Sequence, residues 1–172
     1  ADGKVYDYNT EHSPTQPLTR GWKLHCINAT TGEGIWKILG LSTSRNFAGA
    51  VADGYLVFDN LYDAYLYSFG KGKSATTVTA PDVVVPMGTG VVIKGTVLDM
   101  SPAQPGTPCV SKDSMELQME YLHMQMPIGG LWGNETLTGV PVTLSAMDSN
   151  GNVIDIGTTT TNGYYGTFSK AW

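Results

Sequence analysis

A repeat of roughly fifty residues restricts the folds open to the first part of this sequence. The tripeptide Ala-Asp-Gly occurs at 1–3 and again at 52–54, and an alternating apolar strand follows each copy, KVYDYN in the first and YLVFDN in the second. A strand, a turn, a second strand and a Gly-containing turn in each unit are typical of a β-propeller blade. Residues 1–73 hold about one and a half units, whereas a propeller closes with about four to eight blades, so this segment is expected to belong to something larger.

The composition favours an all-β protein. Hydrophobic residues make up 41% and charged residues only 15% of the chain, against a usual charged share of about a quarter. The net charge of −5, with ten Lys and Arg residues that form no cluster, argues against nucleic acid as a partner. No apolar run is long enough for a membrane span. In the first segment, strands are expected at 3–8, 22–28, 34–38, 47–51, 54–59 and 64–69.

Two sequons suggest where the protein is found. Asn28 and Asn134 each begin an Asn-X-Thr tripeptide, the acceptor for N-linked glycosylation. Both lie at or beside turn-rich segments, and together with the low charge and abundant Thr they favour an extracellular or cell-surface location. We therefore expect both asparagines to be glycosylated where the source modifies its surface proteins. The spacing of Cys26 and Cys109 leaves open whether they form a disulfide.

The segment LHCINATTGEGIWKI, residues 24–38, resembles the propeller repeat of the pyrroloquinoline-quinone type. Asn28, Gly32 and Trp36 occupy the positions that define this repeat. The side chains of Asn28 and Thr30 are expected to bond the turn backbone, Gly32 to adopt a positive φ, and Trp36 to close over a neighbouring sheet. The repeat also occurs in propellers without enzymatic activity, so the resemblance implies an architecture and no chemistry.

The second segment, 74–172, contains Thr- and Val-rich strands separated by turns. Asn150-Gly151 and Asn162-Gly163 are its two strongest hairpin signals. The segment resembles an immunoglobulin-like sandwich module of microbial, particularly archaeal, surface proteins, which often follows a quinone-type propeller. Such modules continue beyond the strand matching GYYGTFSKAW into two further strands. The resemblance therefore implies that both segments are incomplete and that an apolar groove and strand edges are left uncovered.

One helix is expected, as an insert of the second segment near 112–125. Asp113 and Glu116 are spaced as a capping box, and apolar residues follow at helical intervals. We expect this insert to cover an open sheet edge.

Several residue sets are weighed as binding sites, and a structural interpretation is favoured for each. Met115, Met119 and His123 fall on one helical face, as soft ligands of Cu(I) would, but methionines more often fill an irregular core. The oxygen-bearing side chains near Asn150, from Asp148 to Asp155, lack the Gly and Glu positions of a calcium loop. Aromatic residues crowd 55–69 as in a carbohydrate platform, yet strand alternation favours packing. No catalytic residue, cofactor or metal site is expected.

The sequence thus predicts an all-β, non-enzymatic protein with partial propeller-type blades and an incomplete immunoglobulin-like β-sandwich. The function that it favours is a self-assembling extracellular structural or cell-surface subunit, with a filament as one form of assembly. Its partners are expected to be other copies of itself or the remainder of a longer precursor, joined by strand addition near 3–8 or 164–171. A fragment of a quinone-dependent surface oxidoreductase and a carbohydrate or adhesion module remain alternatives.

Overall fold

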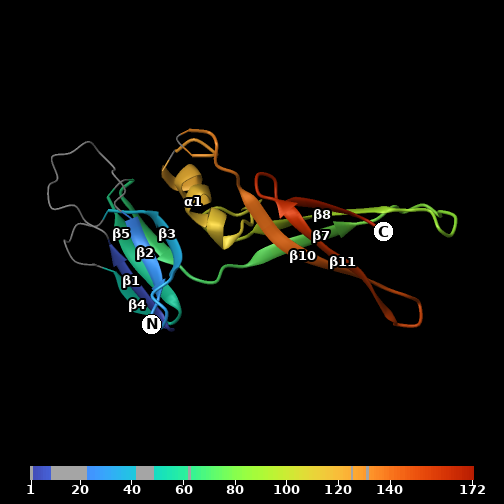
Figure 1. The fold of residues 1–172 in the computed structure, drawn as a ribbon, viewed down its shortest axis with the longest axis horizontal. Helices are drawn as coiled ribbons and strands as arrows, with labels where there is room; N and C mark the ends of the chain where they lie inside the picture. The colour runs from blue at the N-terminus through green and yellow to red at the C-terminus, as the bar shows by residue number, and fades with distance from the viewer. Residues whose placement is uncertain (1, 9–22, 42–48, 62, 125, 131) are drawn as a thin grey trace. The chain divides into compact units, whose positions relative to one another are not determined.

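The computed structural model describes residues 2–8, 23–41, 49–61, 63–124, 126–130 and 132–172. These residues form mainly antiparallel β-strands in several small sheets, together with one short helix (Figure 1). The expectation of a β-rich fold with a short helical insert is confirmed. The chain divides into two compact units, Ala1–Lys71 with Lys112–Glu135, and Gly72–Ser111 with Thr136–Trp172.

The first unit contains two three-stranded antiparallel sheets, in each of which consecutive strands are neighbours. The first sheet comprises β1 (Lys4–Tyr8), β2 (Lys23–Asn28) and β3 (Gly34–Leu39). The second comprises β4 (Ala50–Ala52), β5 (Tyr55–Asn60) and β6 (Tyr65–Phe69). These strands lie where the alternating pattern predicts them, although part of the expected strand at 47–51 falls outside the described residues.

The Ala-Asp-Gly repeat corresponds to a repeated backbone geometry. Asp53 and Gly54 have φ angles of 51° and 81°, and they connect β4 to β5 with Ala52 paired to Tyr55. Positive φ at both central residues is the requirement of a two-residue type I′ hairpin turn. In the other copy, Asp2 and Gly3 show φ angles of 54° and 66°. The sequence repeat therefore specifies the same local turn twice.

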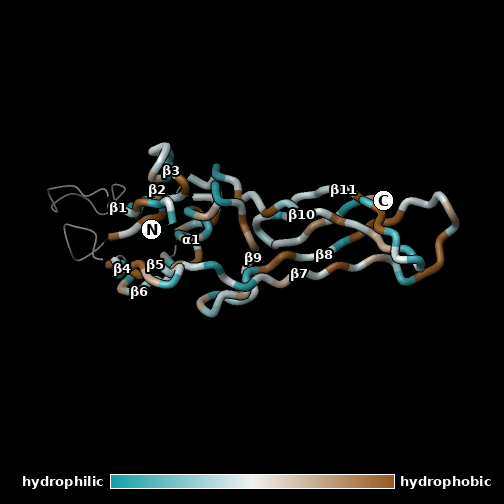
Figure 2. The backbone as a smooth tube through the Cα atoms, turned by 90° about the horizontal axis from the view of Figure 1, so that it is seen from below, coloured by the Kyte–Doolittle hydropathy of each residue, from teal (hydrophilic) through white to brown (hydrophobic). Residues whose placement is uncertain are grey.

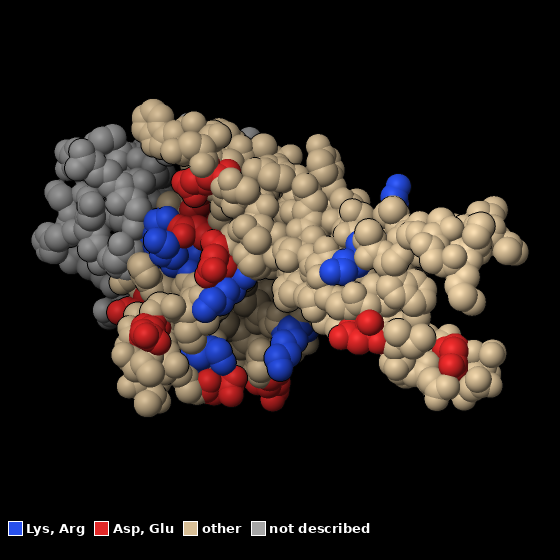
Figure 3. Space-filling view, turned by 45° about the vertical axis from the view of Figure 1, so that its right-hand side comes forward, with Lys and Arg blue, Asp and Glu red and all other residues tan. Residues whose placement is uncertain are grey.

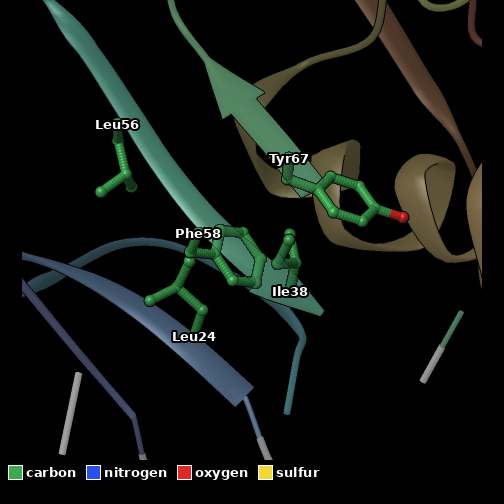
Figure 4. Close-up of a cluster of buried hydrophobic side chains, with 5 residues drawn as sticks. All are labelled: Leu24, Ile38, Leu56, Phe58 and Tyr67. Carbon is green, nitrogen blue, oxygen red and sulfur yellow. The ribbon is translucent and has the colours of Figure 1, made fainter. Parts of the chain in front are cut away.

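The two sheets of the first unit share one hydrophobic core. Leu24 and Ile38 come from the first sheet, and Leu56, Phe58 and Tyr67 from the second (Figure 4). Strand alternation explains this arrangement, because every second side chain of a strand points to the same face. The ring of Phe58 stacks on that of Tyr67 with centroids 5.4 Å apart. The core is thus an aromatic cluster enclosed between two sheets.

Trp36 joins this cluster as the propeller repeat predicts. Its ring stacks on Phe69 of the other sheet at 5.4 Å and lies against Tyr6 at 6.0 Å. Trp36 is partly buried and packs on the core residues. The expectation that this tryptophan closes over a neighbouring sheet is consistent with these contacts.

The helical insert begins with a 3₁₀ turn (Lys112–Ser114) and continues as α1 (Met115–Met124). The expected span of about 112–125 is therefore found. The sequence assigns this insert to the second segment, but its contacts are with β3, and it belongs to the first unit. Met119 packs against the aromatic core, and the ring of His123 meets that of Tyr67 edge-on at 5.5 Å. The helix thus packs on the first unit and does not serve the second segment's sandwich as expected.

The second unit has two layers. One is a sheet with the order β12-β8-β7, to which β9 adds a short pairing with β8, and the other is the hairpin of β10 and β11. Figure 2 shows β10 and β11 in one layer and β7 and β8 in the other. Its small core consists of Ile93, Leu144 and Phe168. The strands are β7 (Ser74–Thr79), β8 (Val92–Asp99), β9 (Thr107–Pro108), β10 (Thr138–Met147), β11 (Val153–Asn162) and β12 (Thr167–Ala171).

The two Asn-Gly signals have different outcomes. Asn150-Gly151 lies in the turn that joins β10 to β11, and Gly151 has a φ of 86°. Asn162-Gly163 also forms a turn, in which the Asn162 side-chain oxygen Oδ1 accepts the N–H of Tyr164 at 2.8 Å. However, β12 pairs with β8 and not with β11, so this turn carries the chain to the other sheet. The interpretation of Asn162-Gly163 as a hairpin turn is therefore wrong.

Trp36→Ala is expected to lower the free energy of unfolding by about 3 kcal/mol, because it removes an aromatic ring from the contact between the two sheets. Trp132→Ala provides the matched control, since the Trp132 side chain is 86% exposed. Chemical denaturation of both variants measures the difference. Equal stability of the two variants would contradict the packing role of Trp36.

Candidate functional site

The candidate site with the most apolar lining is a groove of about 360 Å³ in the second unit. It lies between the β10–β11 hairpin and the sheet that contains β7 and β8. We call it the sandwich groove and define it by the residues Val78, Ala80, Pro81, Val83, Val85, Val91, Ile93, Leu144, Ser145, Ala146, Ile156 and Trp172. Figure 3 shows few charged side chains over the second unit on the face in view.

The groove follows from how the two layers are joined. On one side β11 lies against β12, where the Thr159 hydroxyl donates to the Ser169 carbonyl and the Lys170 ammonium donates to the Thr158 carbonyl, both at 3.2 Å. On the other side, β7 and β10 form no ladder with each other within the described residues. Hydrogen bonds therefore join the layers along β11 and β12, whereas the side along β7 and β10 is open.

The open side exposes apolar side chains that an additional strand would cover. Val78 is 62% exposed, Val83 65% and Trp172 52%. Fully burying an aliphatic side chain of this size stabilises a protein by about 1.5–3 kcal/mol. A strand added here would also extend the small core of Ile93 and Leu144. The expectation of an uncovered apolar groove in the second segment is thus consistent with the structure.

The free edge that borders the groove belongs to β10. Its residues Val142, Leu144 and Ala146 lie on the inner, less exposed face, whereas Thr143 and Ser145 are exposed. Apart from one bridge between Val110 and Gly139, no described strand pairs with its second side. Pro141 fits this position, because proline cannot donate to a ladder and is found mainly on edge strands. The unpaired stretch available to another strand is therefore 142–147.

The turn of the quinone-type repeat forms as expected around Asn28. The Asn28 side-chain oxygen accepts the N–H groups of Thr30 at 2.8 Å and Thr31 at 3.1 Å. Gly32 has a φ of 76°. The hydroxyl that bonds the turn backbone is that of Thr31, which accepts the N–H of Glu33 at 3.3 Å, and not that of Thr30. These residues shape a turn of the first unit, whereas the sandwich groove belongs to the second.

The two sequons differ in their surroundings. Asn134 is exposed in a loop that the bond from Glu135 N–H to the Gly129 carbonyl, at 3.0 Å, closes. Asn28 is only partly exposed, and its side-chain oxygen is occupied by the turn. The structure thus favours Asn134 as the acceptor, and glycosylation of either residue remains a prediction.

In material from the natural source, peptide mass spectrometry is expected to find higher glycan occupancy at Asn134 than at Asn28, because a transferase reaches the exposed loop more easily. Asn134→Gln is expected to remove that glycan without changing the unfolding temperature. Full occupancy at Asn28 with none at Asn134 would contradict this order.

The proposed soft-metal set does not form an open site. Met119 packs on the aromatic core, while His123 contacts the Tyr67 ring, and burial lowers the pKa of its imidazole. Within the described residues, no cluster of three or more His, Cys, Asp or Glu side chains is placed to hold a metal ion. Cys26 and Cys109 are free, and Cys26 is fully buried.

The oxygen-rich segment near Asn150 is a turn. The Asp148 carboxylate accepts a bond from the side chain of Asn152 and from the backbone N–H groups of Asn150 and Asn152, each at 2.8 Å. These bonds, led by that of the Asn152 side chain, lower the pKa of Asp148. Asp155 likewise accepts the Gly157 N–H at 2.8 Å. The structural interpretation of this segment is therefore supported.

The aromatic hairpin divides between core and surface. Tyr67 is only 8% exposed and Phe69 packs against the same core, whereas Tyr65 is 66% exposed. The packing interpretation holds for Tyr67 and Phe69, and Tyr65 projects from the start of β6.

The sequence patterns miss an ion cluster between α1 and the first sheet. Lys23 of β2 contacts Glu116 directly and Glu120 at 3.8 Å, and Lys37 of β3 lies 3.8 Å from Glu116. Burial raises the pKa of Glu120, although the nearby Lys23 opposes this shift. Lys23 and Glu116 are ninety-three positions apart, so no local pattern reveals the contact.

Glu120→Gln is expected to stabilise the protein more at pH 7 than at pH 4. A carboxyl whose folded pKa is raised contributes stability when protonated and loses it as the pH rises through that pKa. Glu120→Gln cannot ionise, so the variant avoids this loss of stability at pH 7. Glu116→Gln is the control and is expected to destabilise the protein at pH 7, because it removes the closest partner of Lys23. Denaturation at both pH values measures these differences, and a uniform effect of Glu120→Gln across pH would contradict the assignment.

No protein-family model, curated protein or solved structure matches this chain. Across the part of the chain that the structure describes, none of the helical segments has the length and apolar character that crossing a bilayer requires.

Proposed function

We propose that this chain is a structural subunit of an extracellular or cell-surface assembly, in which another copy of the chain supplies a β-strand to the sandwich groove. The open side of the second unit carries this proposal. It combines an apolar groove with an unpaired strand edge. An added strand pairs with the edge through its backbone and fills the groove with its side chains. The added backbone pairs with 142–147, and alternate side chains of the added strand enter the groove.

The resemblances inferred from the sequence support this function. Two three-stranded antiparallel sheets with repeated Asp-Gly turns agree with propeller-type blades, and a two-layer unit open on one side agrees with an incomplete immunoglobulin-like sandwich. Neither arrangement brings titratable groups into the groove, whose lining residues are mostly aliphatic. The geometry therefore favours a binding and assembly role over an enzymatic one.

Of the two edges proposed as donors, 3–8 is the more accessible. Among the described strands, β1 stands at the end of the order β1-β2-β3, and Val5 is 48% exposed. The second side of β12 is occupied by contacts with β11, such as that between Thr159 and Ser169. Edge pairing of β1 with β10 of another copy joins two different surfaces. A head-to-tail contact of this kind continues into a filament when it does not close into a ring.

Ala146→Arg is expected to abolish the larger assemblies, because a long charged side chain then occupies the inner face of β10. Thr143→Arg is the matched control on the exposed face of the same strand and is expected to assemble normally. Sedimentation velocity and negative-stain images distinguish these cases, while thermal unfolding checks that both variants fold.

The assembled wild-type protein is also expected to protect the amides of 142–147 from hydrogen exchange relative to the dissociated protein. A wild-type protein that forms no larger assembly, or assemblies that survive Ala146→Arg unchanged, would show that the groove does not accept a strand.

A further inference from the structure

The two Asn-Gly pairs of the chain lie in opposite surroundings. Asn150 and Gly151 are both exposed in the turn between β10 and β11, and a Cβ at Gly151 would meet nothing within 4 Å. Gly163, which follows Asn162, is buried, and a Cβ there would collide with the backbone of Leu137. The first pair therefore has free space around it, whereas the second is closely packed.

The two asparagine side chains also differ in their bonds. The Asn162 side-chain oxygen accepts the N–H groups of Tyr164 at 2.8 Å and of Tyr165 at 3.2 Å. No described residue makes a hydrogen bond to the side chain of Asn150, although its backbone N–H donates to the Asp148 carboxylate at 2.8 Å. The side-chain amide of Asn150 is therefore free to turn toward its own backbone.

We propose that Asn150 is a site of spontaneous chemical modification, at which its side-chain amide becomes a carboxylate through a cyclic imide formed with Gly151. The Gly151 backbone nitrogen attacks Cγ of Asn150 and gives up its proton. A C–N bond forms, the bond between Cγ and the amide nitrogen breaks, and ammonia leaves. Water then adds to either carbonyl of the imide and opens the ring. The products are aspartate and isoaspartate, in which the main chain runs through Cβ, and water is the only other reactant.

The residue after the asparagine controls this reaction, because its backbone nitrogen has to reach Cγ. Glycine has no Cβ to crowd that approach, and it adapts to a change of backbone conformation more easily than other residues. Asn134 and Asn152 are also exposed, but Glu135 and Val153 follow them. The pair that begins at Asn150 thus combines the favourable neighbour with the exposure that ring closure needs.

Asn162 has the same neighbour type but is held in place. It is the last residue of β11 and pairs with Thr138 of β10. Ring closure there requires its two side-chain bonds to break and a paired backbone to rotate. At the other site the reacting nitrogen of Gly151 has one bond, to the Asp148 carbonyl at 3.0 Å. The turn around Asn150 is exposed, so water can replace that bond at little cost.

The modification changes the turn in two ways. Either product places a new negative charge beside the Asp148 carboxylate, which accepts the backbone N–H groups of Asn150 and Asn152. Isoaspartate also lengthens the main chain of the turn by one carbon. The site lies outside the edge 142–147, so this inference is independent of the proposed assembly.

Incubation of the folded protein at mildly alkaline pH, followed by tandem mass spectrometry, tests the proposal. Asn150 is expected to convert at least about tenfold faster than Asn162, because Asn162 first has to lose its two side-chain bonds. In water enriched in heavy oxygen, the product at position 150 is expected to contain one heavy oxygen atom. In denaturant the fold no longer separates the two pairs, and their rates are expected to become similar.

Two variants assign the reaction to one asparagine. Asn150→Gln is expected to remove the conversion seen in the folded protein, because its longer side chain would have to close a larger ring. Asn162→Gln is the matched control and is expected to leave the conversion unchanged. A folded protein in which Asn150 does not convert, in which Asn162 converts equally fast, or in which no isoaspartate forms would overturn the proposal.

Discussion

A β-sheet with one apolar face must bury that face against a second layer, and the structure depends on this requirement throughout. In the first unit the requirement is met from both sides. Leu24 and Ile38 face Phe58 and Tyr67 across the two sheets, and all four are nearly inaccessible to solvent. Stacked aromatic rings form part of this contact, and side chains of this kind bury large apolar areas.

In the second unit the same requirement is met only in part. A two-stranded hairpin covers a sheet that is wider than itself, so Ile93, Leu144 and Phe168 are enclosed while the side along β7 and β10 stays open. Main-chain groups and apolar side chains are exposed together on that side. The proposed strand addition follows from this incomplete cover. One added strand would pair with the exposed main-chain groups and cover the exposed apolar side chains.

The sequence predicts the local features of this fold and fails on the nonlocal ones. Strand alternation and positive-φ turns are set by neighbouring residues, which is why β1 to β6 and the Asp53-Gly54 turn lie where expected. The pairing of β12 with β8 joins Thr167 to Thr96, and no local signal specifies it. The position of α1 depends on Met119 meeting the aromatic core and on Lys23 meeting Glu116. The groove is predicted only through the family resemblance, which implies that strands of the sandwich are missing.

The two units alternate along the chain, which passes from one to the other at 71–72, 111–112 and 135–136. No single backbone cut can release either unit, because at least one other connection still joins them. This arrangement has a mechanical consequence. If a force pulls one unit away from the other, three backbone connections bear it in place of a single linker. This division follows from the assignment of 112–135 to the first unit.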